Sequence, residues 1–445
     1  MKPPFSSFLR AAILVGVLAF LQCKDDVVDV QCPDAGILFS IQNTVSADVI
    51  QKIRYNSSKM NTPHLDGQPG TINPNYPNGK VVVIRVATAN FPGYPDSSTD
   101  YWRNLFFNDD PTTFSVSNYF EFNSRGRFEV AEGGIPIWTQ MTWWDNTTLF
   151  GVEGNSTRAK EILESTFFDW NTVDVNGDGV IASEEAQLVF LFPVWPDVGW
   201  ASTRNVSLGP IDTPNGVFEF ENRNVVYFSI SKSGHWEEPV RGALAAYNHE
   251  LGHAFFDFID RYGNGGTIPN RVGNYDMMGS FDSNQWVHFN VYDKMKLDWL
   301  PIAPVFIDAN IDKNVVLQPV EKGGGVIIVS PENTDREYWI LCFMDRDADN
   351  FESQLPQDGG MAIFHVEKGA FFYGYDRVTL LNAAAVNGSD PAQIDYQKGV
   401  NNGALYDNGK SVELVDKNGD ATGFKITDIN VIMDSNGKKV LCFHI

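Results

Sequence analysis

Residues 248–263 of the chain read NHELGHAFFDFIDRYG. His249 and His253 stand four residues apart, a spacing that places both side chains on one face of an α-helix, about 6 Å apart and within reach of one metal ion. Glu250 is suited to act as a general base toward a water molecule at that ion. The preceding run GALAAY (242–247) is apolar and favours a helix. Because two unliganded histidines would be costly in a buried helix, the stretch predicts a zinc helix inside a folded domain.

This helix supplies two zinc ligands, whereas catalytic zinc takes three from the protein. A thermolysin-type site uses a glutamate from a second helix, but no glutamate occurs between His253 and Glu321. A metzincin-type site follows HExxHxxGxxH/D, in which the glycine lets the chain turn back beneath the ion. Here Phe256 and Ile259 occupy the glycine and ligand positions, so the strict pattern is not met.

Two aspartates remain as candidates for the third ligand. Asp260 falls one residue beyond the metzincin position, and Asp257 is the other acid nearby. In an unbroken helix Asp257 would lie about 12 Å along the axis from His249, whereas a ligand atom has to come within about 2 Å of zinc. We therefore expect the helix to end early and Asp260 to complete the site, with Asp257 as the alternative.

Three stretches resemble the immune-inhibitor-A group of secreted zinc metallopeptidases, the M6 family. Its members typically read HExGHxLGLPDxYD at the zinc helix, then W-D-x-M beneath the metal, then a stretch ending in K-x-x-LGW. This chain reads HELGHAFFDFIDRY (249–262), NYDMMGS (274–280) and HFNVYDKMKLDWL (288–300). It departs from the family at Phe256 and Asp298, which replace glycines, and by one extra residue before the ligand aspartate.

The resemblance covers roughly residues 79–366 and implies a metzincin-like catalytic domain with Asp260 as third ligand. It also implies that Met278 packs beneath the zinc site and that Asp276 supports this turn. His288 aligns with a family histidine, which implies a role in holding the substrate or the oxyanion. Structural packing is the alternative for His288.

A second metal site is indicated by DVNGDGVIASEE (174–185), which fits the calcium loop D-x-[DN]-x-[DN]-G-x5-E at every constrained position. Oxygen ligands select a hard cation, and Gly179 makes the tight turn of the loop. The five expected calcium ligands are Asp174, Asn176, Asp178, the carbonyl of Val180, and Glu185. A strand-like run follows the loop, so we expect a single calcium loop and not a paired EF-hand.

The chain divides into four expected parts within an α+β fold. Residues 1–22 read as a secretory signal peptide, with a lipid anchor at Cys23 as an alternative, and residues 23–78 read as a linker or propeptide. Residues 79–300 would form the zinc metallopeptidase domain, with strands at 81–91 and 186–195 and a helix at 156–172. Residues 301–445 alternate apolar and polar positions between turns, which predicts a β-rich, β-sandwich-like C-terminal domain.

Composition restricts the partners of the protein. The formal charge of −23 argues against nucleic acid, because little in such a chain neutralises phosphates. The apolar run from Ala11 to Leu21 is too short for a membrane span, and no other stretch approaches eighteen uninterrupted apolar residues. Four cysteines suit an exported protein, and a Cys342–Cys442 disulfide is one of three possible pairings. Glycosylation sequons occur at Asn56, Asn146, Asn155, Asn205 and Asn387.

These features predict a secreted zinc endopeptidase that cleaves proteins or peptides with a metal-activated water and Glu250 as general base. Zinc and calcium are the expected cofactors. The alternative is a secreted calcium-binding interaction protein on an inactive metallopeptidase scaffold. The intact HExxH motif and the methionine turn favour the enzyme, whereas Phe256 and the shifted aspartate keep the alternative open.

Overall fold

The structure is a computed structural model, and all of its described residues lie in the compact unit Ile37–Ile445. The expected signal peptide (1–22), nearly all of the expected linker (23–78) and Cys23 lie outside the described residues. The described residues are 78–89, 99–142, 152–193, 201–230, 241–261, 272–279, 287–307, 312–330, 336–370, 376–381, 383 and 403–445.

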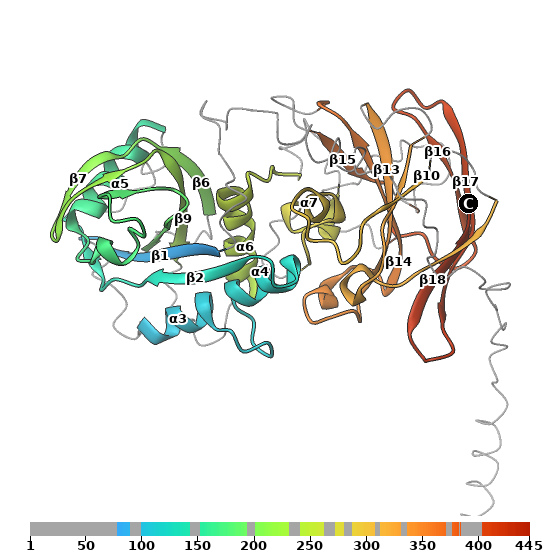
Figure 1. Ribbon diagram of the computed structural model, residues 1–445, viewed down its shortest axis with the longest axis horizontal. Helices are drawn as coiled ribbons and strands as arrows, with labels where there is room; N and C mark the ends of the chain where they lie inside the picture. The colour runs from blue at the N-terminus through green and yellow to red at the C-terminus, as the bar shows by residue number, and fades with distance from the viewer. Residues whose placement is uncertain are drawn as a thin grey trace, which may run out of the picture. The chain divides into compact units, whose positions relative to one another are not determined.

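The first half of the described chain contains a mostly parallel sheet (Figure 1). Its strand order is β2-β1-β5-β9-β6. Outside this order, β3 pairs with the C-terminal end of β1, after the residues of β1 that pair with β2. The first four strands in that order run parallel, and β6 pairs antiparallel with β9 at the end of the order. The strands are β1 (Asn78–Ala87), β2 (Glu129–Gly134), β3 (Thr139–Gln140), β5 (Gln187–Pro193), β6 (Ala201–Val206) and β9 (Arg223–Ile230).

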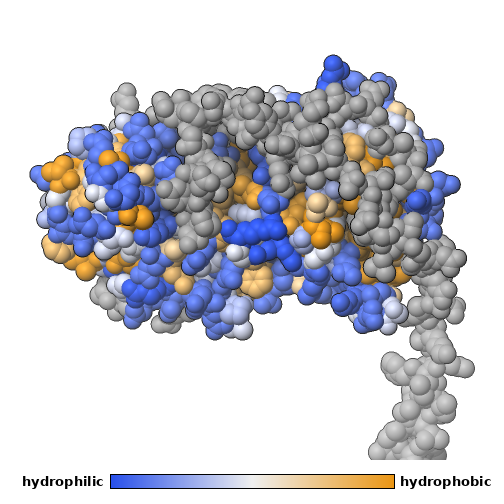
Figure 2. Space-filling view, viewed as in Figure 1, coloured by the Kyte–Doolittle hydropathy of each residue, from blue (hydrophilic) through white to orange (hydrophobic). Residues whose placement is uncertain are grey.

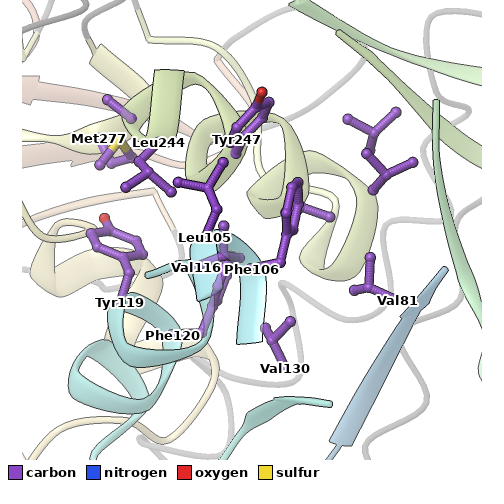
Figure 3. Packing of buried hydrophobic residues seen from close by; sticks show 14 of the residues in the cluster. Val81, Leu105, Phe106, Val116, Tyr119, Phe120, Val130, Leu244, Tyr247 and Met277 are labelled. Carbon is purple, nitrogen blue, oxygen red and sulfur yellow. The ribbon is translucent and has the colours of Figure 1, made fainter. Parts of the chain in front are cut away.

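Strand β1 shows why this sheet is buried on both faces. Val81 and Val83 belong to one hydrophobic core, whereas Val82 and Ile84 belong to another. Successive side chains of a strand point to opposite faces, so an uninterrupted apolar run fits a sheet that is covered on both sides. Helices α3 (Thr99–Phe107), α4 (Val116–Ser124) and α6 (Arg241–Phe256) contribute to the first core, and α5 (Val152–Ser165) contributes to the second. Figure 3 shows side chains of the first core meeting between these helices.

Most elements expected in this half are confirmed. Ser115 caps α4, because its hydroxyl accepts the Asn118 N–H at 3.0 Å, and the helix ends at Arg125 and Gly126 with φ of 58° and 72° before β2 begins. The strand expected at 186–195 is β5. The helix expected at 156–172 is wrong in its bounds, since α5 ends at Ser165, where the Thr166 hydroxyl bonds back to the Ile162 carbonyl at 2.7 Å.

The second half is β-rich, as expected, and consists of two sheets. The first has the order β10-β12-β13-β14-β15 and the second β11-β18-β17-β16, and one core contains side chains of both. The strands are β10 (Val305–Ile307), β11 (Asn314–Leu317), β12 (Ile327–Val329), β13 (Glu337–Asp345), β14 (Gly359–Glu367), β15 (Arg377–Leu380), β16 (Lys410–Val415), β17 (Ala421–Met433) and β18 (Lys439–His444).

The change from the parallel sheet to the β-rich part falls close to residue 300, after α7 (Val291–Lys296). A third core spans this point, because it combines Tyr275, Val291 and Leu300 with side chains of β13 and β14. Hydrophilic side chains cover much of the described surface in Figure 2, with apolar ones scattered among them. Among the described residues, no helix is long and apolar enough to cross a membrane.

Candidate metal centre

Helix α6 carries both histidines of the HExxH motif. His249 is 1% exposed and His253 is partly buried, and the centroids of their rings lie 4.8 Å apart. The helix forms over an alanine- and leucine-rich run. Leu244 and Leu251, which stand two turns apart, pack in the first core. The expected helix is therefore present, with both imidazoles on one side.

The helix ends at Asp257, where the chain adopts a left-handed conformation. Asp257 has φ of 55°, and its N–H bonds to the His253 carbonyl at 3.0 Å, a single-residue left-handed cap. Aspartate tolerates this conformation better than most residues. Asp257 thus makes the turn for which the metzincin pattern uses glycine, one position later than the pattern places it.

The turn brings Asp260 beside the two histidines. Asp260 Oδ1 lies 2.9 Å from His249 Nε2 and 3.0 Å from His253 Nε2, and the two Nε2 atoms lie 3.1 Å apart. Ligand atoms around tetrahedral zinc, with bonds near 2 Å, are about 3.3 Å apart. The triangle of donor atoms therefore has nearly the size that a zinc ion needs, and it contains Asp260 and not Asp257.

Backbone carbonyls fix the orientation of both imidazoles. His249 Nδ1 lies 2.9 Å from the Met277 carbonyl oxygen, and His253 Nδ1 contacts the Phe258 carbonyl oxygen. A carbonyl oxygen can only accept, so each Nδ1 carries a proton, and the Nε2 atoms are the ring nitrogens that lie at the triangle. Metal-bound histidines are held in this way by their second nitrogen. The residues thus fit a zinc ion that leaves a fourth position for water or substrate.

The charges at the triangle call for a cation. Burial lowers the pKa of His253, but the charge and hydrogen bond of Asp260 raise it by more, so the pKa of His253 reaches about 9. Burial raises the pKa of Asp260, yet His253 and His249 outweigh this effect and hold that pKa well below its usual range. A proton thus takes the place in which a metal ion would bind.

The methionine turn lies directly beneath α6. Met278 is fully buried, and a Cβ added to Gly252 would lie 3.2 Å from its sulfur and 3.0 Å from Phe289. A side chain at Gly252 would thus be tight against the methionine turn, and its neighbours would have to shift by a few tenths of an ångström. The fully buried Asp276 accepts the Met278 N–H at 3.1 Å and the Asn290 side-chain amide at 2.6 Å. Met278 and Asp276 thus occupy the positions that the resemblance implied.

Arg261 ties the ligand loop to this turn. Its N–H donates to the Met278 carbonyl at 2.8 Å, and its guanidinium bonds to Asp276 at 3.0 Å and to both carboxylate oxygens of Asp293 at 2.5 and 2.7 Å. Burial lowers the pKa of Arg261, but Asp293 and Asp276 raise it above its ordinary value. Since Arg261 follows Asp260 directly, this buried ion pair fixes the position of the third donor.

Glu250 is buried and held by strand β6, which ends the strand order of the sheet among the described residues. The Thr203 hydroxyl, on β6, lies 2.8 Å from Glu250 Oε2 and 2.9 Å from the Glu250 carbonyl oxygen. The Glu250 carboxylate is close enough to His253 for its charge to raise the pKa of that histidine, although burial and Asp260 have larger effects. Glu250 therefore lies next to the triangle with one oxygen bonded.

The expected calcium loop is folded around its own carboxylates. Asp174 accepts the N–H groups of Gly177 and Gly179 at 2.7 and 2.9 Å, and Glu185 accepts those of Val175 and Ala182 at 2.8 and 3.0 Å. Both glycines have left-handed φ, 72° and 78°. The strands around the loop are β4 (Val180–Ile181), β7 (Gly209–Thr213) and β8 (Gly216–Phe220), and β5 follows it.

The acids expected to bind calcium do not converge as His249, His253 and Asp260 do. Among the described residues, the acids of the loop are absent from the groups of three histidine, cysteine or carboxylate side chains with donor atoms within 4.8 Å of one another. Asn176 and Asp178 bond to each other at 2.9 Å, and the Val180 N–H bonds to Asp178 at 2.8 Å. The loop has the turns of a calcium loop, and its ion stays a prediction.

His288 lies away from the triangle, in a separate buried cluster. It is 2% exposed, and its Nε2 bonds to Asp349 Oδ2 at 2.8 Å. Its ring stacks on Tyr119 at 6.3 Å and meets the edge of Phe351. This position fits the alternative of structural packing better than contact with a substrate.

Two further expectations concern single residues. The Cys342–Cys442 disulfide is wrong, because Cys342 is a free, buried thiol on β13, and burial raises its pKa well above the usual range. Of the sequons, Asn205 lies half-buried on β6 and donates to Asn224 at 3.3 Å. The side chains of the other four sequons lie outside the described residues.

Sequence reasoning did not find Thr203, Arg261 or Asp293. Thr203 has no motif, since it reaches Glu250 only through the pairing of β6 with the sheet. Arg261 offered one signal, a basic residue directly after Asp260 in a stretch rich in apolar residues. No protein-family model matches the sequence, and no curated protein matches it.

Proposed function

We propose that the protein is an exported zinc endopeptidase. The observation that carries this proposal is the triangle of His249 Nε2, His253 Nε2 and Asp260 Oδ1, with sides of 2.9 to 3.1 Å and both Nδ1 atoms held by carbonyl oxygens. Two imidazoles and one carboxylate form a donor set that catalytic zinc accepts. Export is supported by the signal-like residues 1–22 of the sequence.

The residues around the triangle divide the work of peptide hydrolysis. Zinc bound there would supply a Lewis acid that polarises the peptide carbonyl and lowers the pKa of water toward neutrality. Glu250 would accept the proton of the attacking water and pass it to the leaving amine. Thr203 would hold the Glu250 carboxylate in place through its 2.8 Å hydrogen bond. No covalent intermediate with the protein is required.

Strand β6 offers a place for a peptide substrate. It ends the strand order of its sheet among the described residues, so one side of its backbone has no strand partner there. Edge strands of this kind bind extended peptides by adding a strand. Because Thr203 lies on β6 and bonds to Glu250, a peptide along this edge would pass the general base. An extended substrate suits an endopeptidase.

The same observations bear on the alternative, an inactive calcium-binding interaction protein. An inactive scaffold has no need of a buried Glu250 bonded to Thr203, nor of three donor atoms that converge on one point. We also propose that the protein is related to the immune-inhibitor-A peptidases and that its C-terminal part is a β-sandwich. Asp257 and Asp298 support the relation, because both have left-handed φ where the family has glycines. Asp298 stands at the position of a family glycine, and Asp257 stands one residue after such a position.

Metal analysis and a digestion assay test the proposal. The purified protein should hold zinc and degrade casein, and a chelator should stop the digestion. Glu250→Gln should keep the zinc and lose at least about a hundredfold in rate, since a positioned general base contributes 10² to 10⁴. Glu164→Gln, at an exposed position on α5, is the matched control and should behave as the wild type. Undiminished cleavage by Glu250→Gln would refute the mechanism.

A further inference from the structure

A second cluster of metal-binding side chains lies in the third core, distinct from the HExxH triangle. One ring nitrogen of His288 and one carboxylate oxygen each of Glu321 and Glu352 lie within 4.8 Å of one another. The three residues come from separate segments, the 3₁₀-helices Val320–Lys322 and Glu352–Gln354 and the residues before α7. A ligand held by all three would connect parts of the chain that are more than thirty residues apart.

His288 has the hydrogen bonds of a metal ligand. Its Nε2 bonds to Asp349 Oδ2 at 2.8 Å, and an ionised carboxylate only accepts, so Nε2 carries a proton and Nδ1 is the ring nitrogen left for a metal ion. Nδ1 is buried and has no hydrogen-bond partner among the described residues. A carboxylate that orients the second nitrogen of a histidine is the usual arrangement around metal-bound histidines. The free Nδ1 therefore points to a missing partner.

Glu352 provides a second unpartnered atom in the same cluster. It is 1% exposed, and its Oε2 has no hydrogen-bond partner among the described residues. Such a buried oxygen costs free energy unless a proton or a cation binds it. Glu352 and His288 thus each have a buried, unsatisfied polar atom, and both belong to the cluster that contains Glu321.

The charges of the cluster do not balance. Lys294 Nζ lies 2.6 Å from Glu321 Oε1, and both side chains are buried. The carboxylates of Glu321, Asp349 and Glu352 lie around this ammonium, so carboxylates outnumber it in the cluster. A divalent cation would offset this excess of carboxylates. Burial raises the pKa of Glu352, and the charges of Glu321 and Asp349 raise it further, so a proton is the competing solution.

A pocket borders the cluster at Glu321. This pocket of about 580 Å³ is lined by Lys294, Glu321 and Asp349, with Glu121 and Arg125 of the α4 end among its other walls. One imidazole and two carboxylates suit zinc or a similar first-row ion, whereas calcium and magnesium prefer oxygen ligands alone. We propose that His288, Glu321 and Glu352 form a second, structural binding site for a divalent transition-metal ion.

This site would also support the candidate active centre. The His288 carbonyl accepts the Met277 N–H at 3.2 Å, and the Met277 carbonyl holds His249 Nδ1 at 2.9 Å. The backbone of the methionine turn thus joins the two clusters. An ion that fixes His288 would limit the movement of the turn on which His249 depends.

Four versions of the full chain test the second site. After equilibration with zinc and gel filtration, we expect two zinc ions per chain in the wild type, one in Glu352→Gln, one in Asp260→Ala and none in the double variant. Glu352→Gln keeps the shape of the side chain and removes its charge. Glu337→Gln is the matched control, because Glu337 pairs with His365 at 3.0 Å outside both clusters, and it should bind as the wild type does.

The outcomes separate this inference from the proposed function. A zinc count in Glu352→Gln equal to that of the wild type overturns the second site, whatever Asp260→Ala shows. A count that falls in Glu352→Gln but not in Asp260→Ala supports the second site and contradicts the first. If Glu352→Gln does not fold, Lys294→Met serves instead. It keeps all three ligands and removes the competing cation, so it should bind zinc at least about tenfold more tightly, and unchanged or weaker binding overturns the proposal.

Discussion

Two aspartates take the place of glycines at turns around the candidate centre. Asp257 and Asp298 have φ of 55° and 61°, a region that glycine enters without strain. Asp260 stands three positions after Asp257, the same spacing as from the glycine to the third ligand in the metzincin pattern. The sequence therefore allowed Asp260 to be expected from its spacing, but not the role of Asp257, because a left-handed aspartate has no motif.

Replacement of Asp257 tests its role as a turn residue. Asp257→Gly should raise the free energy of unfolding by up to about 1 kcal/mol, since glycine removes the cost of the left-handed conformation, and Asp257→Ala should lower it. Both variants should keep their zinc, because the donor triangle contains Asp260. Urea denaturation and metal analysis provide the two measurements. Zinc loss in Asp257→Gly would show that Asp257 is itself a ligand.

Arg261 is the residue whose removal should be most damaging near the site. Arg261→Met would leave the carboxylates of Asp276 and Asp293 buried without their cation, so we expect a loss of about 3 to 5 kcal/mol in unfolding free energy. Arg261→Lys should recover part of it, because an ammonium keeps the charge but not the two-pronged geometry. Chemical denaturation of the three proteins measures the effect. A loss below 1 kcal/mol in Arg261→Met would contradict the importance of this ion pair.

The hydrogen bond from Thr203 on β6 to Glu250 on α6 links two elements, and its removal tests the proposed catalysis. Thr203→Val should keep the zinc content and lower kcat/KM by about ten- to a hundredfold, since a hydrogen bond to a charged group is worth about 1.5 to 3 kcal/mol. Thr203→Ser should restore most of the rate, because the hydroxyl is retained. The assay is peptide hydrolysis at matched zinc content. Equal rates for the valine and serine variants would remove Thr203 from the account.

The loop 174–185 connects α5 with β5, and its expected ion is testable through stability. Calcium should raise the melting temperature of the wild type by several degrees, because a ligand that binds only the folded chain stabilises it by mass action. Glu185→Gln should lose this response, since Glu185 is the bidentate ligand of the loop pattern. Glu184→Gln, one residue earlier and outside the pattern, should retain it. An equal calcium response in both variants would contradict the calcium site.

How far the elements were predictable depended on the range of the interactions that form them. The strands β1, β13 and β14 follow from their own apolar runs, and the end of α4 follows from the turn at Gly126. The end of α5 at Ser165 was missed because Thr166 bonds back to Ile162, which periodicity does not reveal. Likewise, Thr203 meets Glu250 across 47 residues, a contact that depends on the order of the strands in the sheet.

At the scale of the whole molecule, the cysteines show what composition cannot decide. An even number of cysteines in an exported chain suggested pairing within the C-terminal part, but Cys342 points into the core between α7 and β13 and remains free. That core combines residues before and after residue 300. A boundary drawn from the change of sequence pattern thus marks a change of sheet type, and it does not separate two independent cores.

Removal of the metal should change how the stability of the whole chain depends on pH. The pKa of His253 is about 9 in the folded chain, chiefly because Asp260 outweighs burial, with Glu250 adding to the effect, whereas that of an unfolded histidine is about 6.5. A folded pKa above the unfolded one stabilises the protein fully below pH 6.5 and no longer does so above pH 9. The chelated protein should therefore lose up to about 3 kcal/mol of unfolding free energy across this window.

In the zinc-saturated protein the unfolding free energy should depend little on pH across this window, because the metal replaces the proton. Chelated Asp260→Asn should show a smaller dependence than the chelated wild type. Denaturation curves at pH 6 and pH 9.5 measure both slopes, and an Asp260→Asn slope equal to that of the wild type would mean that Asp260 does not face His253.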